Sequence, residues 1–281
     1  MFDFPEFIRF PVRGYIDAGM KWLLKHCSVF FDALGWLILH VMNFFTFIFT
    51  SIPWFVLIIV IFLLGWKLMK SLKTAFMMSL MLFIIGGFGY WELAMQTLGL
   101  VSASVMFSLL IGIPTGVAMA QSDRSQMILK PILDGMQTMP SFVYLIPALM
   151  FFGLGKVPSV IATIIYAVPP VIRLTNVGIR TVDKEAVEAA KAFGAKKSEI
   201  LWDVQLPLAK PSIMVGINQT TMMALAMVVI GSMIGAKGLG MEVLMSISRI
   251  DVGRGFEAGI SIVFLAIIID RITHTISQNK K

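Results

Sequence analysis

The chain has 281 residues, of which 58% are hydrophobic and 14% are charged, and its mean hydropathy is +0.87. A soluble domain carries about 25% charged residues, so this composition excludes an ordinary soluble protein and indicates an integral membrane protein. The net charge of +7 does not indicate nucleic-acid binding, because the basic residues lie in short loops between apolar runs, where membrane topology explains them.

The sequence offers no set of residues for catalysis or for a metal ion. Cys27 is the only cysteine, and the three histidines, His26, His40 and His274, are far apart and fit no ligand spacing. No phosphate-binding loop of the form G-x-x-x-x-G-K-[ST] is present, and no nucleophile–base pair or paired carboxylates stand out. We therefore expect a protein that is not an enzyme, with no catalytic residue, no metal site and no cofactor of its own.

The first part of the chain divides into two segments. Residues 1–28 combine aromatic side chains with basic residues such as Arg9 and Arg13, a composition typical of a helix at the lipid headgroups. Residues 29–91 are expected to form accessory membrane helices, and 29–66 is long enough for one tilted span or a tight pair. A pair would place the amino terminus in the cytoplasm, which the positive-inside tendency favours, whereas a single span would leave it outside.

Basic loops and small residues organise the next segments. The lysine-rich stretch 67–73 indicates a cytoplasmic loop, and a span is predicted over 74–91. The chain returns inward over 93–120, where glycines and a proline are expected either for close helix packing or for a path that must open. The polar stretch 121–130 is again predicted to be a cytoplasmic loop.

Prolines mark the following pair of predicted spans, 137–155 and 157–175. A proline inside a span frees a carbonyl that protein or cavity water must satisfy, so these helices either border a pathway or hold a static kink. A further span over 212–235 is predicted to run outward to a Gly-rich external loop, 236–255. A last span over 256–272 then returns the chain to the cytoplasm.

A polar island, 188–207, lies between two apolar stretches and reads EAAKAFGAKKSEILWDVQLP. Asp183 is suited to cap a first short helix, which should stop at Gly194 in the left-handed conformation of a C-terminal turn. Ser198 can cap a second helix, which should end before Pro207 because proline removes a backbone donor. The island is therefore predicted to form a helix–turn–helix knob suited to docking.

The island resembles a cytoplasmic loop of the membrane subunits of bacterial ABC importers, which has the form E-A-A, three residues, G, nine residues, I, any residue, L-P. The matching residues are Glu188, Ala189, Ala190, Gly194, Val204, Leu206 and Pro207, with Val204 in place of isoleucine. In that family the loop holds a coupling helix that sits in a cleft of the ATPase subunit. The resemblance implies that ATP and Mg are bound by this partner ATPase.

The resemblance also implies a fold and a location. The expected fold is an all-α integral membrane protein, the transmembrane domain of a type I ABC importer, with about seven to eight membrane helices including a five-helix core. The core is expected over 92–275 with the coupling loop at 181–211, followed by a short basic tail, 276–281. The expected location is the bacterial cytoplasmic membrane, with several spans and with the coupling loop and the carboxyl terminus in the cytoplasm.

Longer segments, among them QTMPSFVYLIPALMFFGLG, are similar to permeases of the glycine betaine, proline betaine and choline importers. This branch implies ATP-driven alternating access for a quaternary-ammonium osmoprotectant; the alternative solute is an amino acid, a sulfonate or a phosphonate. The implied partners are a second copy of the permease, two ATPase subunits that often carry regulatory domains, a separate extracytoplasmic binding protein, expected to be a lipoprotein, and membrane lipid, without nucleic acid. A carrier or channel acting alone would leave the polar island unexplained, and an intramembrane enzyme would lack a catalytic set.

The implied substrate class suggests which residues line the pathway. A quaternary ammonium has no N–H to donate, so proteins hold it with aromatic faces, at about 0.5–2 kcal/mol for each contact. The candidate pathway residues are Phe142, Tyr144, Phe151, Phe152, Tyr166 and Asn218. The competing interpretation for each aromatic residue is contact with lipid or a neighbouring helix, and for Asn218 it is an interhelical hydrogen bond.

Overall fold

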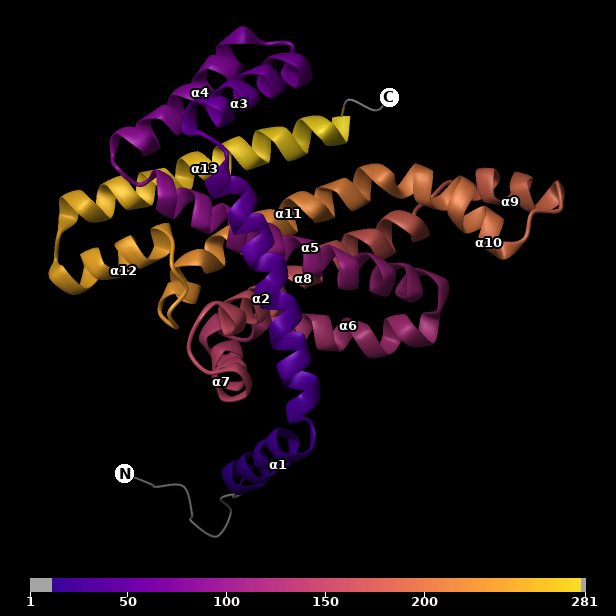
Figure 1. The fold of residues 1–281 in the computed structure, drawn as a ribbon. Helices are drawn as coiled ribbons and strands as arrows, with labels where there is room; N and C mark the ends of the chain where they lie inside the picture. Colours follow the sequence, from indigo (N-terminus) through magenta and orange to yellow (C-terminus); the bar gives the residue numbers. More distant parts are fainter. Residues whose placement is uncertain (1–11, 279–281) are drawn as a thin grey trace, which may run out of the picture.

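The computed structural model describes residues 12–278, and every regular element in that range is a helix (Figure 1). In chain order the elements are α1 (Val12–His26), α2 (Ser28–Ser51), α3 (Trp54–Met69), α4 (Leu72–Gly87), α5 (Trp91–Gln121), α6 (Asp123–Thr138), α7 (Ser141–Phe152), α8 (Lys156–Arg180), α9 (Lys184–Ala192), α10 (Lys197–Glu199), a π-helical segment (Ile200–Gln205), α11 (Leu206–Ser232), α12 (Leu239–Arg249) and α13 (Val252–Gln278).

Within the described range, five helices are long and apolar enough to cross a membrane: α2, α5, α8, the continuous helix Lys197–Ser232 and α13. The helices α3 and α4 are apolar but have only 16 residues each, a length of about 24 Å. The helices α6 and α7 form a further apolar unit that is bent by 99°. This set agrees with the predicted all-α membrane protein of seven to eight membrane helices.

The centre of the bundle consists of α5, α8 and α11, whose backbones approach closely at glycines. A Cβ atom added at Gly116 of α5 would lie 2.6 Å from the Cβ of Thr175 and 2.7 Å from the carbonyl oxygen of Ile172, both on α8. One added at Gly216 of α11 would lie 3.0 Å from the Cα of Val171. The prediction that small residues of the α5 segment serve close helix packing is therefore confirmed.

The two ends of this bundle carry different elements (Figure 1). The knob end carries α9 and α10, which extend beyond the last turns of α8 and the first turns of α11. The α12 end carries the short helix between α11 and α13, where the backbone N–H of Leu239 donates to Thr97 Oγ1 of α5 at 2.9 Å. At the same end, the N–H of Gly155 donates to the carbonyl of Ile234 at 2.8 Å, which ties the start of α8 to the end of α11.

The accessory helices α1 to α4 flank this centre. The segment 29–66 forms two helices, because the extended Ile52 ends α2 and Pro53 lies at the start of α3. The helix α2 packs on α5, α7 and α8, whereas α3 and α4 form a hairpin that contacts α13. A helix in the predicted interfacial segment is confirmed over α1, and the rest of that segment, 1–11, and the tail residues 279–281 lie outside the described residues.

The span predicted over 137–155 is broken in the structure. Met139 is extended, with ψ of 132°, and the chain turns there by 99° between α6 and α7. The cause is Pro140, which lacks an N–H and disfavours the helical conformation of the residue before it. The prediction of one continuous span is therefore wrong, and α7 is a separate helix of 12 residues.

Two predicted loops also contain helix. The polar stretch 121–130 holds the last residue of α5 and the first half of α6, which Ser122 caps by accepting from the N–H of Ser125 at 3.3 Å. The Gly-rich stretch 236–255 contains α12, whose buried residues Leu239, Glu242 and Ser246 recur every three to four positions. Both helices have one face against the bundle, and tertiary packing outweighs the loop-like composition of their sequences.

Candidate functional site

The first half of the knob is the short helix α9, and its ends are as predicted. Asp183 caps it, because its Oδ1 accepts from the backbone N–H of Glu185 at 3.0 Å. The helix ends at Gly194, which has a φ of +83°. A residue with a Cβ atom rarely adopts this conformation, so Gly194 sets the direction in which the chain leaves α9.

The second half of the knob begins two residues earlier than predicted. The helix α10 starts after Lys196, whose backbone N–H donates to the Glu199 carboxylate at 2.8 Å. Ser198 therefore lies inside the helix and is not its cap. The signal for this start is the glutamate three residues after the cap position, which is typical of helix N-termini.

This second helix does not end before Pro207, so that prediction is wrong. The chain winds as a π-helix over Ile200–Gln205 and continues directly into α11, giving one helix of 36 residues. In the wider turn the N–H of Leu206 bonds to the carbonyl of Leu201, five residues back. Pro207 follows directly after this wider turn and lies inside the continuous helix.

The motif residues are divided between the surface of the knob and its root. The exposed members are Glu188, Ala189, Gly194 and Pro207, and the partly buried members are Ala190, Val204 and Leu206. At the root, Leu206 packs against the buried side chains of Ile179 and Leu201, which belong to α8 and the π-helical segment. The root therefore joins the knob to the central helices.

The outer surface of the knob carries two aromatic residues that sequence reasoning did not select. The Phe193 and Trp202 side chains are 93% and 68% exposed. A pocket of about 290 Å³ lies between α9 and the end of α8 and is lined by Glu188, Lys191 and Arg180, among others. Exposed aromatic residues near charged side chains are typical of a protein-binding surface. The sequence signal that could have identified Phe193 and Trp202 is the presence of aromatic residues within a polar island.

Two ion pairs join α6 to α8, and the first lies at the knob end. Arg180 Nη1 is 2.7 Å from Asp123 Oδ1. Its other nitrogens donate to the side chain of Asn176 at 3.1 Å and to the carbonyl of Met119 at 2.8 Å. Arg180 thus links the ends of α5 and α8 to the start of α6.

The second ion pair lies deeper in the bundle. Arg173 Nη2 is 2.6 Å from Asp134 Oδ1. Two residues further along α6, the carbonyl of Met136 accepts a hydrogen bond from the Tyr144 hydroxyl of α7, and Tyr144 packs in one cluster with Tyr166 of α8. The structure therefore brings two predicted pathway residues together at the elbow of α6 and α7, and α6 also carries the acidic partner of Arg173, an arginine that was not predicted.

The other aromatic candidates lie on α7 away from this pair of tyrosines. Phe142 is 52% exposed on the surface of α7. Phe151 stacks on Phe31 of α2 at a centroid distance of 4.1 Å, and Phe152 meets the same ring edge to face at 5.9 Å. The latter two residues therefore fasten α7 to the accessory helix α2.

Asn218 also has partners of its own. Its Nδ2 donates to Asp270 Oδ1 at 2.9 Å, and its Oδ1 accepts from Thr273 Oγ1 at 2.7 Å. Both hydrogen-bonding groups of this amide are used by α13. The arrangement has the form of the interhelical hydrogen bond that was the competing interpretation.

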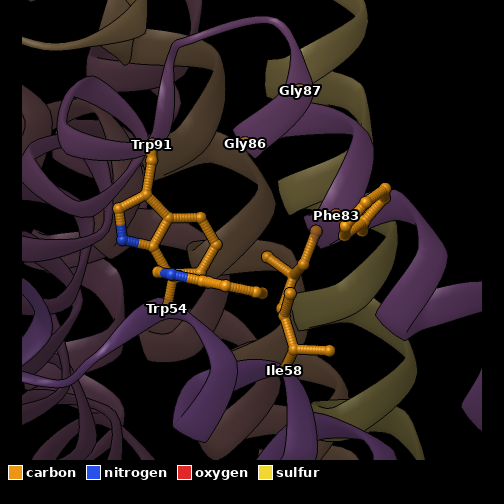
Figure 2. A pocket seen from close by; sticks show the side chains of 7 residues that line it. Trp54, Ile58, Phe83, Gly86, Gly87 and Trp91 are labelled. Carbon is orange, nitrogen blue, oxygen red and sulfur yellow. The ribbon is translucent and has the colours of Figure 1, made fainter.

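Two cavities in the accessory region have apolar walls. One, of about 400 Å³, is lined by Trp54, Ile58, Leu82, Phe83, Gly86, Gly87 and Trp91 (Figure 2). Trp54 and Trp91, whose indole rings are drawn in Figure 2, both line it. The other, of about 490 Å³, lies between α3, α5 and α13 and has no charged side chain in its lining. Tryptophans at helix ends suit the membrane interface, so these cavities fit lipid chains better than a zwitterion.

The α12 end is held by a nearly buried carboxylate. The side chain of Glu242 is 9% exposed, and Arg254 approaches its Oε2 through Nε and Nη2, each at 2.6 Å. Burial, and then the neighbouring Glu242 and Glu257, raise the pKa of Tyr90, so this phenol stays protonated at neutral pH. The cluster joins α12 to the starts of α5 and α13.

Replacing Glu242 with alanine is expected to destabilise the protein, because Arg254 would lose the nearly buried carboxylate that joins α12 to α13. We expect a lower free energy of unfolding, measured by thermal unfolding in detergent, and a larger loss than Asp17→Ala causes. Asp17→Ala removes one partner of the exposed pair with Arg13 and should change stability by less than about 0.5 kcal/mol. Equal stability of the two variants would contradict the prediction.

Within residues 12–278, no three His, Cys, Asp or Glu side chains lie close enough together to hold a metal ion. Residues 108–281, more than half of the chain, match the family described as the binding-protein-dependent transport system inner membrane component. The chain belongs to this family. It is the membrane-spanning permease subunit of an ABC importer and not an enzyme, and such an importer works with a substrate-binding protein and an ATPase.

The permease is similar along almost its whole length to three named bacterial proteins. It is 44% identical to the glycine betaine/carnitine transport permease protein GbuB of Listeria monocytogenes, covering 99% of both chains. It is 43% identical to the glycine betaine/proline betaine transport system permease protein ProW of Escherichia coli, over 96% of this chain and 76% of that one. With the glycine betaine transport system permease protein OpuAB of Bacillus subtilis the identity is 42%, over 97% and 96% of the two chains.

A solved structure has the same fold. The permease superposes on a chain of the inward-facing MetNI methionine ABC transporter with a TM-score of 0.60 and 20% identity. The match covers 65% of this chain and 91% of that one. About a third of the permease therefore lies outside the match, and the fold is that of a type I importer transmembrane domain.

Proposed function

We propose that the permease imports glycine betaine or a related quaternary-ammonium osmoprotectant by ATP-driven alternating access. The observation that carries this proposal is the 44% identity, over 99% of both chains, to a permease named for glycine betaine and carnitine. A second candidate is the same machinery for another small solute, such as an amino acid, a sulfonate or a phosphonate. The methionine transporter shows that the same fold also serves a permease for another solute at 20% identity.

The ATPase is proposed to dock on the knob, through the motif residues Glu188, Ala189, Ala190, Gly194, Val204, Leu206 and Pro207. In this proposal Phe193 and Trp202 lie at the contact, because both are largely exposed beside the motif. The helix Lys197–Ser232 is uninterrupted, so a displacement of the knob would move α11 as one body. This continuity supports a mechanical link between ATP hydrolysis, with Mg and ATP held by the partner, and the spans.

The proposed assembly contains two copies of the permease, two ATPase subunits, which can carry regulatory domains, and a separate extracytoplasmic binding protein, expected to be a lipoprotein. The knob and the carboxyl terminus are placed in the cytoplasm, and the α12 end faces outward. The division of 29–66 into two helices, α2 and α3, supports an amino terminus on the cytoplasmic side. Accessory helices over 29–91 and a core over 92–275 are the proposed division of the chain.

The proposed pathway runs beside α7 and α8, with Tyr144, Tyr166 and Phe142 as its aromatic residues. The proximity of the two tyrosines supports this, because a quaternary ammonium is held by aromatic faces. Phe151, Phe152 and Asn218 were candidates from the sequence, but their contacts with α2 and α13 assign them to packing in this proposal.

Competition in living cells tests the substrate class. The permease would be expressed with its ATPase and binding protein in a strain that lacks other betaine uptake, and the uptake of labelled glycine betaine would be measured. We expect unlabelled proline betaine or carnitine to reduce this uptake at least tenfold, and methionine, taurine or methylphosphonate to leave it unchanged. Competition by one of the latter compounds, or uptake of that compound without betaine uptake, would favour the second candidate.

A further inference from the structure

The ion pair of Arg173 and Asp134 lies within the membrane-spanning part of the permease. Arg173 is two helical turns before Arg180, so it lies about 10 Å deeper along α8 than the end of that helix. Its guanidinium is 2.6 Å from the Asp134 carboxylate of α6. The side chains of Arg173 and Asp134 are nevertheless 35% and 51% exposed.

An exposed pair of charges at this depth cannot face lipid without a large cost, because the bilayer offers no hydrogen bonds and a low dielectric constant. Charged residues within membrane spans therefore face the protein interior or a water-filled cavity. The exposed side of this pair accordingly faces a polar compartment. In the proposed assembly this compartment is either the path of the solute or the contact with the second copy of the permease, and the thiol labelling described below distinguishes the two.

Arg173 keeps a hydrogen-bonding group that the protein does not use. Its Nε is buried and has no hydrogen-bond partner within the described part of the chain. Arg180 is different, because it bonds Asp123, Asn176 and the Met119 carbonyl at once. Arg180 is thus fully engaged by the protein, whereas the described part of the chain gives the guanidinium of Arg173 one hydrogen bond, to Asp134.

The face of α8 that carries Arg173 also carries an aromatic residue. Tyr166 is seven residues earlier on α8, about 10 Å along the helix, and Tyr144 packs in one cluster with Tyr166. Aromatic faces attract a quaternary ammonium, and a guanidinium binds a carboxylate. One face of α8 thus offers a place for each end of a zwitterion.

We propose that Arg173 binds the carboxylate of the solute during its passage and that Asp134 is the resident counter-ion that the solute replaces. This inference rests on the proposed betaine substrate. When no solute is present, the ion pair neutralises Arg173 and joins α6 to α8 across the pathway. When a zwitterion arrives, its carboxylate replaces Asp134 at the guanidinium of Arg173. Its ammonium then lies near the released Asp134 and on the side of the tyrosines. No bond is made or broken in this exchange.

The first test measures betaine uptake by proteoliposomes that contain the permease, its ATPase and its binding protein. We expect Arg173→Gln to lower kcat/KM for uptake at least twentyfold and Arg173→Lys to lower it about fivefold, because lysine keeps the charge but loses the planar fork of donors. The exchanged variant Arg173→Asp/Asp134→Arg restores an ion pair between α6 and α8. If the pair were only a clamp, the exchange would restore uptake. We expect the exchange to restore thermal stability but to leave uptake at least tenfold low.

Asp123→Asn is the matched control. It removes the acid of the ion pair with Arg180, which also joins α6 to α8, and the side chain of Asp123 is exposed. It should leave uptake within twofold of the wild-type value. Uptake within twofold for Arg173→Gln, or full uptake by the exchanged variant, would overturn the inference. A wild-type protein that does not transport betaine would instead reject the proposed function on which the inference rests.

A second measurement does not depend on the activity of an arginine variant. In a Cys27→Ser background the chain has no other cysteine, so Asp134→Cys provides a single thiol at the pair. Thiolates react in water, and we expect a membrane-impermeant methanethiosulfonate that carries a trimethylammonium group to label this thiol. Phe83→Cys, at an exposed apolar position of α4, should react at least tenfold more slowly. Equal rates at the two positions would contradict a polar compartment at the pair.

Discussion

Replacing Gly194 with valine is expected to abolish ATP-driven uptake while the protein stays in the membrane. Gly194 has a φ of +83°, which a β-branched residue adopts only under strain, so the turn after α9 would change direction. No heavy atom lies within 4 Å of an added Cβ, so the effect comes from the backbone and not from a clash. We expect a loss of at least twentyfold in uptake, measured in proteoliposomes beside the ATPase activity of the same preparation.

Gly194→Asn is the matched control, because asparagine tolerates the left-handed conformation better than other residues with a Cβ atom. It should retain most of the uptake. Charge reversal at the exposed Glu188, by Glu188→Lys, should also uncouple or release the ATPase while the protein inserts normally. Normal uptake by both Gly194→Val and Glu188→Lys would reject the assignment of the knob as the coupling element.

Replacing Gly116 with leucine should have the largest effect on stability. The added Cβ would lie 2.6 Å from the Thr175 Cβ and 2.7 Å from the Ile172 carbonyl oxygen, so the backbones of α5 and α8 would have to separate. Overpacking of this kind typically costs about 1–3 kcal/mol and more where backbone must move, and we expect at least about 3 kcal/mol here. The measurement is the free energy of unfolding in detergent, by circular dichroism during a denaturant titration.

Gly259→Ala serves as the control for this packing prediction. Gly259 also lies inside a long helix, α13, but no heavy atom is within 4 Å of its added Cβ. The variant should be as stable as the wild type, or slightly more stable because alanine favours the helix. A Gly116→Leu protein that unfolds at the same denaturant concentration as Gly259→Ala would show that the contact between α5 and α8 is not close-packed.

Apolar length and basic loops predicted the number and approximate places of the membrane helices, because burial of the backbone in lipid allows few alternatives. The predicted boundaries of helices and loops were wrong where tertiary contacts outweigh composition. The Gly-rich flanks of α12 conceal a helix whose buried face carries Leu239 and Glu242. Pro140 breaks its predicted span, whereas Pro207 does not end its helix, because a π-helical turn precedes it. The effect of a proline therefore depends on neighbouring hydrogen bonds that the sequence does not display.

The candidate site was predictable to different extents. The caps at Asp183 and Gly194 follow from local chemistry, and the structure has both. The contacts of Asn218 with α13 depend on residues more than 50 positions away, which no local pattern reveals. The contact of Arg173 with Asp134 was missed for the same reason, since the two residues are 39 positions apart. An arginine within an apolar segment was nevertheless a visible signal for a functional residue.

The most direct test of the account is the uptake of labelled glycine betaine by proteoliposomes assembled with and without each partner. The account predicts concentrative uptake that requires the permease, its ATPase, the external binding protein and ATP together, and that stops when the ATPase is left out. Uptake that continues without the ATPase, driven by an ion gradient instead, would contradict it.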